Sequence, residues 1–247
     1  MVIKRVFSVL KSCNYDVGLF INNHVIPHIN NHLILDVAKK RHILLPKEYG
    51  KYGININGIL YTLSSFNDSI LWQVENEYNY DDIRPEDIVL DIGANIGYFS
   101  LRVSNQCSKV FSVEPLYTNE LRENIQLNQL QNKITILPYA LSLFDTDIQF
   151  GGRAGRATGK TLTELIHLCS GTVNVLKCDC EGGEWTITPN QLQGIRRIEM
   201  EIHRFNGEDI EKLIKELFVD YDVIIDHENH DTVMVHAFLK KKNKVSS

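Results

Sequence analysis

The stretch that decides the fold is VLDIGANIGYFS, residues 89–100. An apolar run ends at the carboxylate Asp91 and passes through a tight turn into a helix. The turn residues that we expect to approach a ligand are Gly93, Ala94, Asn95 and Gly97. Small residues let the backbone come close to a ligand, and the first N–H groups of the helix stay free to bind it. The stretch therefore predicts a ligand site at the end of a buried central strand.

Short apolar strands alternate with amphipathic helices from residue 88 onward. The expected strands are 88–94, 109–115, 133–140, 173–179 and 195–203, followed by a hairpin of 221–226 and 232–240. The expected helices are 95–106, 119–130 and 207–218. This alternation favours an α/β fold, in which helices cover both faces of a mostly parallel sheet and the hairpin adds an antiparallel strand.

The first 79 residues differ from the rest because they are rich in Asn, His and Tyr and only weakly periodic. Segments 32–45 and 53–65 are possible strands. We interpret residues 1–79 as an N-terminal extension of mixed structure that caps an α/β domain of residues 80–247.

Two acids indicate which nucleoside binds. Enzymes that use dinucleotides place a pyrophosphate at this turn, and a carboxylate at Asp91 would repel it. S-adenosylmethionine has a sulfonium and an ammonium group and no phosphate, so it suits an acid there. Glu114 ends the second strand 21 residues after Gly93, where an acid accepts hydrogen bonds from ribose hydroxyls. The alternative is that Asp91 only caps the helix and Glu114 only lies at a solvated edge.

The motifs of the chain resemble those of FkbM-type methyltransferases. They are VLDIGANIGYFS, VFSVEP, LRENIQLNQ, KTLTELI, VLKCDCEGGEW and IEMEIH, in the family's order, over roughly residues 66–205. The resemblance implies a Rossmann-like class I methyltransferase fold with sheet order 3-2-1-4-5-7-6, and S-adenosylmethionine as the donor for methylation of hydroxyl oxygens. The cofactor residues it implies are Asp91, Gly93, Ala94, Asn95, Gly97, Glu114 and Pro115, with Ala140 and Leu141 against the adenine. Leu143 departs from the family pattern, in which an acid is common at this position.

The fourth strand ends in a group of acids, Asp179, Glu181 and Glu184. Packing would not select them, because unpaired buried carboxylates are costly. Methyl transfer to a hydroxyl requires a proton acceptor, and our candidates are Asp179 first, then Glu181, then His203 at the end of the fifth strand. Glu184 is expected at the substrate, although Glu181 and Glu184 could instead cap a helix or form salt bridges, and His203 could be structural.

The segment AGRATGKT, residues 154–161, matches a loose phosphate-loop pattern. A true phosphate loop follows directly on a buried strand, and the polar FDTDIQF before it is not a convincing one. We therefore favour a mobile loop over the substrate cleft, with Arg153, Arg156 and Lys160 available to an anionic or sugar acceptor. A nucleotide triphosphatase that uses this loop is the alternative.

Two sets of residues could hold a metal. Asp179, Glu201 and His203 stand at the ends of neighbouring strands and could coordinate a hard divalent cation, although we favour a site without metal. Three histidines at four-residue spacing, His24, His28 and His32, could lie on one helix face. Pro27 weakens that helix, so we expect ordinary surface histidines.

Composition narrows the remaining choices. The net charge of −5 disfavours nucleic acid and anionic membranes as partners. Together with the resemblance to FkbM-type methyltransferases, this charge leads us to expect a sugar or small-metabolite acceptor. An RNA methyltransferase and a non-catalytic nucleotide-binding protein remain alternatives. Five cysteines without CxxC spacing indicate reduced thiols. Since no apolar run of about 18 residues and no signal peptide are found, we expect a cytoplasmic protein.

Overall fold

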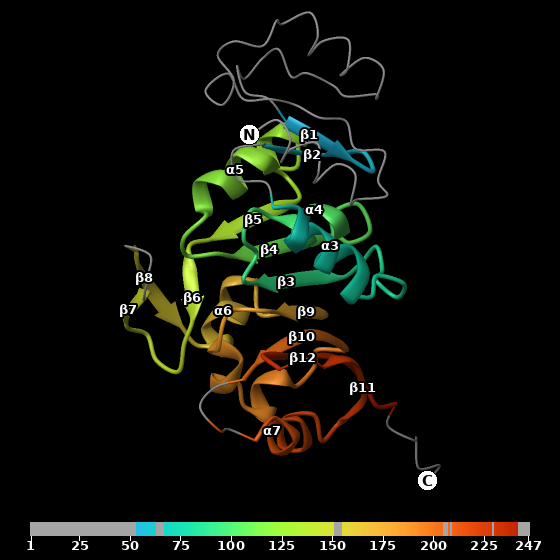
Figure 1. Cartoon of the computed structure of the whole chain (residues 1–247), viewed down its shortest axis with the longest axis vertical. Coiled ribbons are helices and arrows are strands. Elements are labelled where there is room, and N and C mark those ends of the chain that lie inside the picture. The colour runs from blue at the N-terminus through green and yellow to red at the C-terminus, as the bar shows by residue number, and fades with distance from the viewer. Residues whose placement is uncertain are drawn as a thin grey trace, which may run out of the picture.

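The computed structural model describes residues 53–62, 67–150, 155–204, 207, 209–228 and 230–241. At its centre lies a sheet of seven strands (Figure 1). These strands are β3 (Ile88–Ile92), β4 (Lys109–Val113), β5 (Ile134–Leu137), β9 (Val175–Cys178), β10 (Arg197–His203), β11 (Tyr221–Glu228) and β12 (Thr232–Leu239). Numbered one to seven in chain order, they lie in the order 3-2-1-4-5-7-6, as the resemblance implies. β12 runs in the opposite direction to the other six strands, so its pairs with β10 and β11 are antiparallel and all other pairs in the sheet are parallel.

Helices cover both faces of this sheet. They are α3 (Asp68–Glu77), α4 (Tyr98–Val103), α5 (Thr118–Leu127), α6 (Leu162–Leu168) and α7 (Ile210–Leu217), with short 3-10 turns at η1 (Gly183–Thr186) and η2 (Pro189–Leu192). Successive residues of β3 point to opposite faces. Val89 packs with Phe99 of α4 and Leu121 of α5, whereas Leu90 packs in a second cluster with Leu165 of α6. In the described part of the chain, no helix is long and apolar enough to cross a membrane.

A second, smaller sheet was not predicted. It consists of β6 (Tyr139–Leu141), β7 (Asp147–Phe150) and β8 (Gly155–Lys160), and it stands at the side toward which β3, β4 and β5 point (Figure 1). The strand predicted over 133–140 is confirmed as β5, but its extent is wrong. β5 and β6 are separated at Pro138, which has no N–H for the ladder, and β6 belongs to the second sheet.

The structure also corrects the interpretation of AGRATGKT. Residues 155–160 form the strand β8, which pairs with β6 and β7, so they are neither a mobile loop nor the turn that a phosphate loop requires. Glycine is needed at Gly159 for packing, since a Cβ there would lie 2.7 Å from the Cβ of Ser142. Position 154 lies outside the described residues.

The described part of the N-terminal extension packs on the main domain. β1 (Gly53–Ile56) and β2 (Ile59–Thr62) form a hairpin around Asn57 and Gly58, which both have positive φ as a tight hairpin turn requires. Tyr61 is fully buried in the same cluster as Val89. The possible strand at 32–45 lies outside the described residues, and the boundary at residue 79 stays a prediction.

Asparagine side chains of α5 hold this hairpin in place. Asn124 is fully buried; its Oδ1 accepts from the N–H of Thr62 and its Nδ2 donates to the carbonyl of Ile96, both at 2.8 Å. One turn further, Asn128 accepts from the N–H of Leu60 at 2.8 Å. The hairpin is thereby tied to the turn that follows β3.

We predict that Asn124→Ala lowers the free energy of unfolding by about 2 kcal/mol, because it leaves two buried backbone groups without their partner. The control is Asn119→Ala on the same helix, an exposed position where we expect a change of less than about 0.5 kcal/mol. Urea denaturation measures both. Equal losses in the two variants would contradict this role of Asn124.

Candidate active site

The turn after β3 packs directly on the end of β9. Gly93, Asn95 and Gly97 all have positive φ, at 75°, 52° and 99°. A Cβ on Gly93 would lie 1.6 Å from the carbonyl oxygen of Asp179, which no side chain can tolerate. The glycine therefore serves a close approach of two backbones, and it brings the predicted cofactor turn into contact with the predicted catalytic acid.

Glu114 links the second strand to the same turn. Its Oε2 accepts from the N–H of Asn95 at 2.8 Å, and its Oε1 accepts from the N–H groups of Leu116 and Tyr117 at 2.7 and 3.0 Å. Burial raises the pKa of Glu114 to about 6, against the opposing effect of these hydrogen bonds. A carboxylate has about four lone-pair positions, so capacity remains for a ribose hydroxyl. The alternative that Glu114 only lies at a solvated edge is excluded.

Asp91 is fully buried and paired. Its Oδ2 accepts from the hydroxyl of Ser100 at 2.6 Å, and its Oδ1 lies 3.3 Å from Nζ of Lys177. Burial alone would lower the pKa of Lys177, but Asp91 and Asp179 outweigh it and hold that pKa above its ordinary value. The sequence analysis expected the negative charge of Asp91 to be available to a cationic ligand. The structure corrects this expectation, because the ammonium group of Lys177 compensates that charge. A contact of Asp91 with the cofactor stays a prediction.

Lys177 also joins the turn to Asp179, the predicted catalytic acid. Its Nζ donates to the carbonyl of Gly93 at 2.8 Å and lies 3.7 Å from Oδ2 of Asp179. The ammonium group thus occupies the space between the two acids, Asp91 and Asp179. This is the structural ion pair that a lysine within a central strand needs, because an unpaired buried ammonium would be costly.

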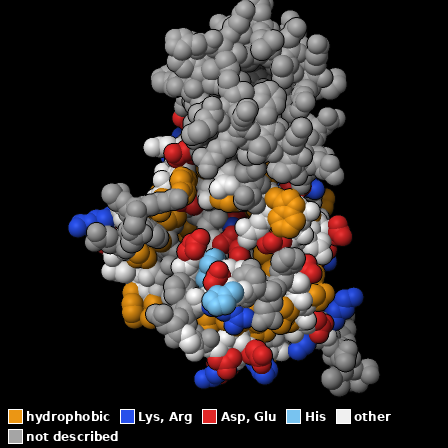
Figure 2. Space-filling model, in the orientation of Figure 1, with side chains coloured by type: hydrophobic (Ala, Val, Ile, Leu, Met, Phe, Trp, Pro, Cys, Tyr) orange, Lys and Arg blue, Asp and Glu red, His pale blue; other side chains and the backbone are white. Residues whose placement is uncertain are grey.

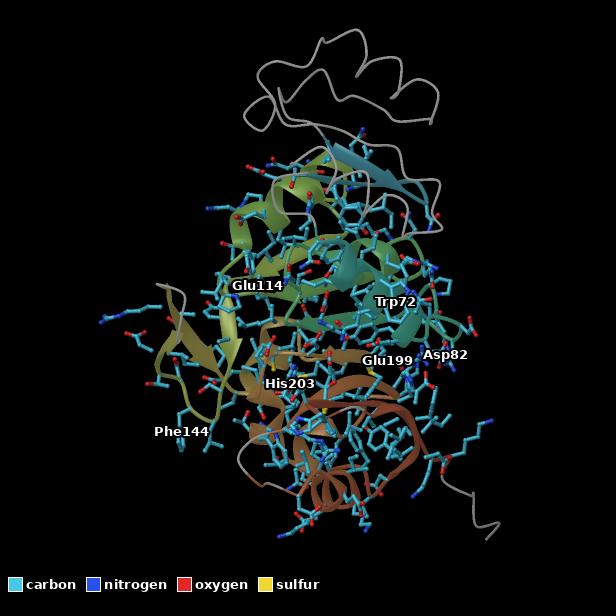
Figure 3. The ribbon with its side chains drawn as sticks, in the orientation of Figure 1. Trp72, Asp82, Glu114, Phe144, Glu199 and His203 are labelled. Carbon is cyan, nitrogen blue, oxygen red and sulfur yellow. The ribbon has the colours of Figure 1, made fainter. Side chains whose placement is uncertain are left out.

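The three predicted catalytic residues come together at the carboxyl ends of β9 and β10. Nε2 of His203 lies 4.0 Å from Oδ1 of Asp179 and 3.5 Å from Oε2 of Glu181. Glu181 is exposed, at 87 % for its side chain, whereas Asp179 and His203 are largely buried. Acidic and histidine side chains gather in a hollow of this face (Figure 2), and His203 lies on the same side of the sheet as Glu114 (Figure 3).

Glu184 orients the imidazole ring of His203 through a contact with its Nδ1 atom. Its carboxylate is fully buried and lies 2.6 Å from Nδ1 of His203, so the predicted contact of Glu184 with substrate is wrong and the salt-bridging alternative holds. Burial would lower the pKa of His203, but the bond to Glu184 and the nearby charges of Asp179 and Glu181 raise it to about 9. Trp185 donates to the carbonyl of His203 at 2.8 Å. The imidazole ring is therefore held with its Nε2 atom toward Asp179 and the exposed Glu181.

Residues from α3 and its C-terminal end complete the site, and the sequence analysis did not find them. The hydroxyl of Tyr78 donates to Oδ2 of Asp179 at 3.0 Å, and Nε2 of Gln73 donates to Oε2 of Glu201 at 2.6 Å. Burial, and then the charge of Asp179, raise the pKa of Glu201. The signal that could have found the helix is the helical spacing of its buried residues, Leu71, Val74 and Tyr78.

Strand β6 of the second sheet also lies beside the site. Ala140 and Leu141 are buried in β6, and a Cβ on Gly183 would lie 3.2 Å from the Cβ of Leu141, so β6 packs on the turn that carries Glu184. Their contact with adenine, and that of the half-buried Pro115, stay predictions.

The basic residues predicted for the acceptor differ in their surroundings. Lys160 forms salt bridges with Asp145 and, at 3.5 Å, with Glu164, so its charge is compensated within this part of the fold. Arg156 is exposed on β8, and Arg153 lies outside the described residues. A contact of Arg156 with an acceptor stays a prediction.

The possible metal ligands are also brought together. Asp179, Glu201 and His203 each offer one ligand atom, and these atoms lie within 4.8 Å of one another. The other predicted group, His24, His28 and His32, lies outside the described residues.

Comparison with known proteins gives one family match and similar structures. A family model described as "Methyltransferase FkbM domain" matches residues 91–234, more than half of the 247 residues. One similar structure is TYW2 of M. jannaschii in complex with AdoMet, which is 16% identical in sequence. The match covers 81% of this chain and 90% of the TYW2 chain, with a TM-score of 0.49. The tRNA m1G37 methyltransferase of M. jannaschii is 18% identical with a TM-score of 0.48 and covers 78% of this chain, which spans only 57% of that enzyme. Neither likeness identifies a substrate.

We predict that Gly93→Ala destabilises the protein by about 3 kcal/mol, because the new Cβ forces the β3 turn away from Asp179. Gly171→Ala is the matched control: φ is also positive, at 77°, but a Cβ there meets nothing within 4 Å. We expect the control to lose about 1 kcal/mol from backbone strain alone. Chemical denaturation compares them, and similar losses would show that the close approach at Gly93 is not required.

Proposed function

Because this chain belongs to the FkbM methyltransferase family, we propose that it transfers the methyl group of S-adenosylmethionine to a hydroxyl oxygen of a sugar or another small metabolite. The observation that carries the proposal is the position of the proton-accepting group. Asp179, Glu181 and His203 stand together at the strand ends, and the backbone of Asp179 touches the glycine turn at Gly93. A donor bound at the turn would therefore present its methyl group beside the carboxylates of Asp179 and Glu181, which can accept a proton, whereas a pKa of about 9 keeps His203 protonated at neutral pH.

The donor site in this proposal is formed by the turn and by Glu114. The remaining lone pair of the Glu114 carboxylate accepts a ribose hydroxyl, while the backbone of the turn lies against the nucleoside. The residues that we propose to surround the donor are Asp91, Gly93, Ala94, Asn95, Gly97, Glu114, Pro115, Ala140 and Leu141. Asp91 contributes indirectly, because its charge is paired with Lys177.

The reaction is an in-line displacement at the methyl carbon. The acceptor oxygen forms a bond to this carbon as the bond to sulfur breaks, and the electron pair of that bond remains on sulfur, which becomes a neutral thioether. The acceptor loses one proton, which a carboxylate of the group accepts. Asp179 is the first candidate, because its backbone touches the glycine turn at Gly93 and its carboxylate faces His203. Binding mainly supplies the alignment of oxygen, carbon and sulfur.

The charges of the site favour a neutral acceptor. Asp179, Glu181 and Glu201 lie around the position where the acceptor would bind, and they would repel a phosphate group. A hydroxyl, by contrast, donates a hydrogen bond to a carboxylate. The same argument disfavours an RNA acceptor, although retention on a nucleic-acid column at physiological salt would revive it.

We predict that Asp179→Asn lowers kcat for methylation of a hydroxyl acceptor by about 100-fold or more, since proton removal contributes this much in general base catalysis. The affinity for S-adenosylmethionine, measured by calorimetry, should change by less than about threefold. Asp222→Asn, an exposed acid of β11, is the control and should leave both values unchanged. Mass spectrometry of the product identifies the methyl ether. An unchanged kcat in Asp179→Asn would contradict the assignment.

A second prediction concerns pH. The pKa of Glu114 is raised to about 6, so its carboxylate is ionised above that pH and progressively protonated below it. Only the ionised form accepts fully from a ribose hydroxyl, so the affinity for S-adenosylmethionine should fall, by up to tenfold per pH unit, as pH drops below 6. Calorimetry between pH 5 and 8 measures it.

Glu114→Gln should weaken donor binding at pH 8 by about tenfold or more, because it removes a charge-assisted hydrogen bond, and should abolish the pH dependence. Glu216→Gln, an exposed glutamate of α7, is the matched control. An affinity that is constant from pH 5 to 8 in the unaltered protein would be inconsistent with ribose binding at Glu114.

A further inference from the structure

We infer that Asp179, Glu201 and His203 bind one divalent metal ion. The sequence left this site as the less favoured alternative, because strand ends alone do not establish that three side chains converge. The structure places one ligand atom of each within 4.8 Å of the others. Ligands on opposite sides of an ion, each at about 2.0–2.4 Å from it, lie about 4–5 Å apart. The three atoms are therefore close enough to share one ion with little movement.

The backbone explains this convergence. β9 and β10 are parallel neighbours in which Met200 pairs with Cys178, so Glu201 lies next to Asp179 at the carboxyl end of the pair. His203 follows Glu201 by two residues and thus shares its face of the strand. Glu201 and His203 belong to β10 and Asp179 directly follows β9, so the three ligands lie at the carboxyl ends of two neighbouring strands of the sheet.

The hydrogen-bonding arrangement of His203 is typical of a metal-binding histidine. Such a histidine nearly always donates its other ring N–H to a carboxylate or carbonyl group, which fixes the tautomer and the direction of the ring. Here Nδ1 lies 2.6 Å from the fully buried carboxylate of Glu184, and Nε2 faces Asp179 and Glu181. A histidine that served only for packing would not need a buried acid in this position, because burying that acid is costly.

The two carboxylate ligands are held in the same way. Gln73 donates to one oxygen of Glu201, and Tyr78 donates to one oxygen of Asp179. Both donors are neutral and orient the carboxylates, while the charge of Asp179 is partly offset by Lys177, whose Nζ lies 3.7 Å from its Oδ2. Each of the three ligands thus has a partner in a second layer, as is typical of metal sites.

The local charge also favours a cation. Two positively charged or ionisable groups, Lys177 and His203, face a larger number of acids. These acids are Asp91, Asp179, Glu181, Glu184 and Glu201. A divalent ion would offset much of the excess. Carboxylates suit Mg²⁺, Ca²⁺ and Mn²⁺, whereas imidazole suits Zn²⁺ and other first-row metals, so the mixed set fits an ion such as Mn²⁺.

The role of the ion rests on the proposed function. Asp179, Glu201 and His203 would hold the ion, which would supply a Lewis acid that lowers the pKa of an acceptor hydroxyl. Asp179 would then be a ligand, and Glu181, the exposed acid beside His203, would accept the proton while sulfur keeps the electron pair of the broken bond to the methyl carbon.

The test is a titration of the full-length, metal-stripped protein with Mn²⁺ alone, followed by electron paramagnetic resonance, without donor or acceptor. We expect one Mn²⁺ per chain. Glu201→Gln should weaken binding at least tenfold, and Glu184→Gln, through His203, by about tenfold. Glu216→Gln on α7 should bind as the unaltered protein does. Circular dichroism checks folding, and Asp179→Asn replaces Glu201→Gln if that variant does not fold.

Absence of a saturable Mn²⁺ site in the unaltered protein, or equal affinity in Glu201→Gln, would overturn the inference. Methyl transfer that persists in excess chelator without Mn²⁺ binding would overturn the metal site and leave the proposed function standing. Conversely, Mn²⁺ binding that depends on Glu201 supports the site even if no hydroxyl acceptor is methylated, a result that would count against the proposed function alone.

Discussion

The close contact between Gly93 and the carbonyl of Asp179 is the constraint on which the rest of the site depends. A side chain at Gly93 would collide with that carbonyl, so the two strand ends approach each other only because the residue is glycine. Lys177 fixes the contact from inside the sheet, since it donates to the carbonyl of Gly93 and lies between the charges of Asp91 and Asp179. The predicted donor turn and the predicted reaction group are thus in direct contact and are joined by Lys177.

Around this contact, buried polar groups hold the reactive ones in position. Glu184 fixes the imidazole of His203, and Tyr78 holds the carboxylate of Asp179. Buried acids stabilise a fold poorly, because they lose their hydration. Glu184 and Glu201 are buried beside the carboxyl ends of β9 and β10, where a ligand binds in such sheets, and this position supports the proposal that they orient reactive atoms.

Much of the fold could be predicted from the sequence, because apolar strands and amphipathic helices have distinct periods. The acids Glu114 and Asp179 and the histidine His203 could be placed because each ends a strand. The strand β8 could not, since its sequence GRATGK lacks the apolar alternation of a strand and pairs through its backbone. The pairing of Asp91 with Lys177 depends on the neighbouring positions of β3 and β9, which no local pattern encodes.

The central claim is that the glycine turn and Glu114 hold the donor nucleoside beside Asp179. A crystal structure with S-adenosylhomocysteine tests it most directly. The account predicts a ribose hydroxyl within hydrogen-bonding distance of the Glu114 carboxylate, and the sulfur on the side of Asp179 and His203. A nucleoside bound away from Glu114, or a sulfur that faces away from the ends of β9 and β10, would contradict it.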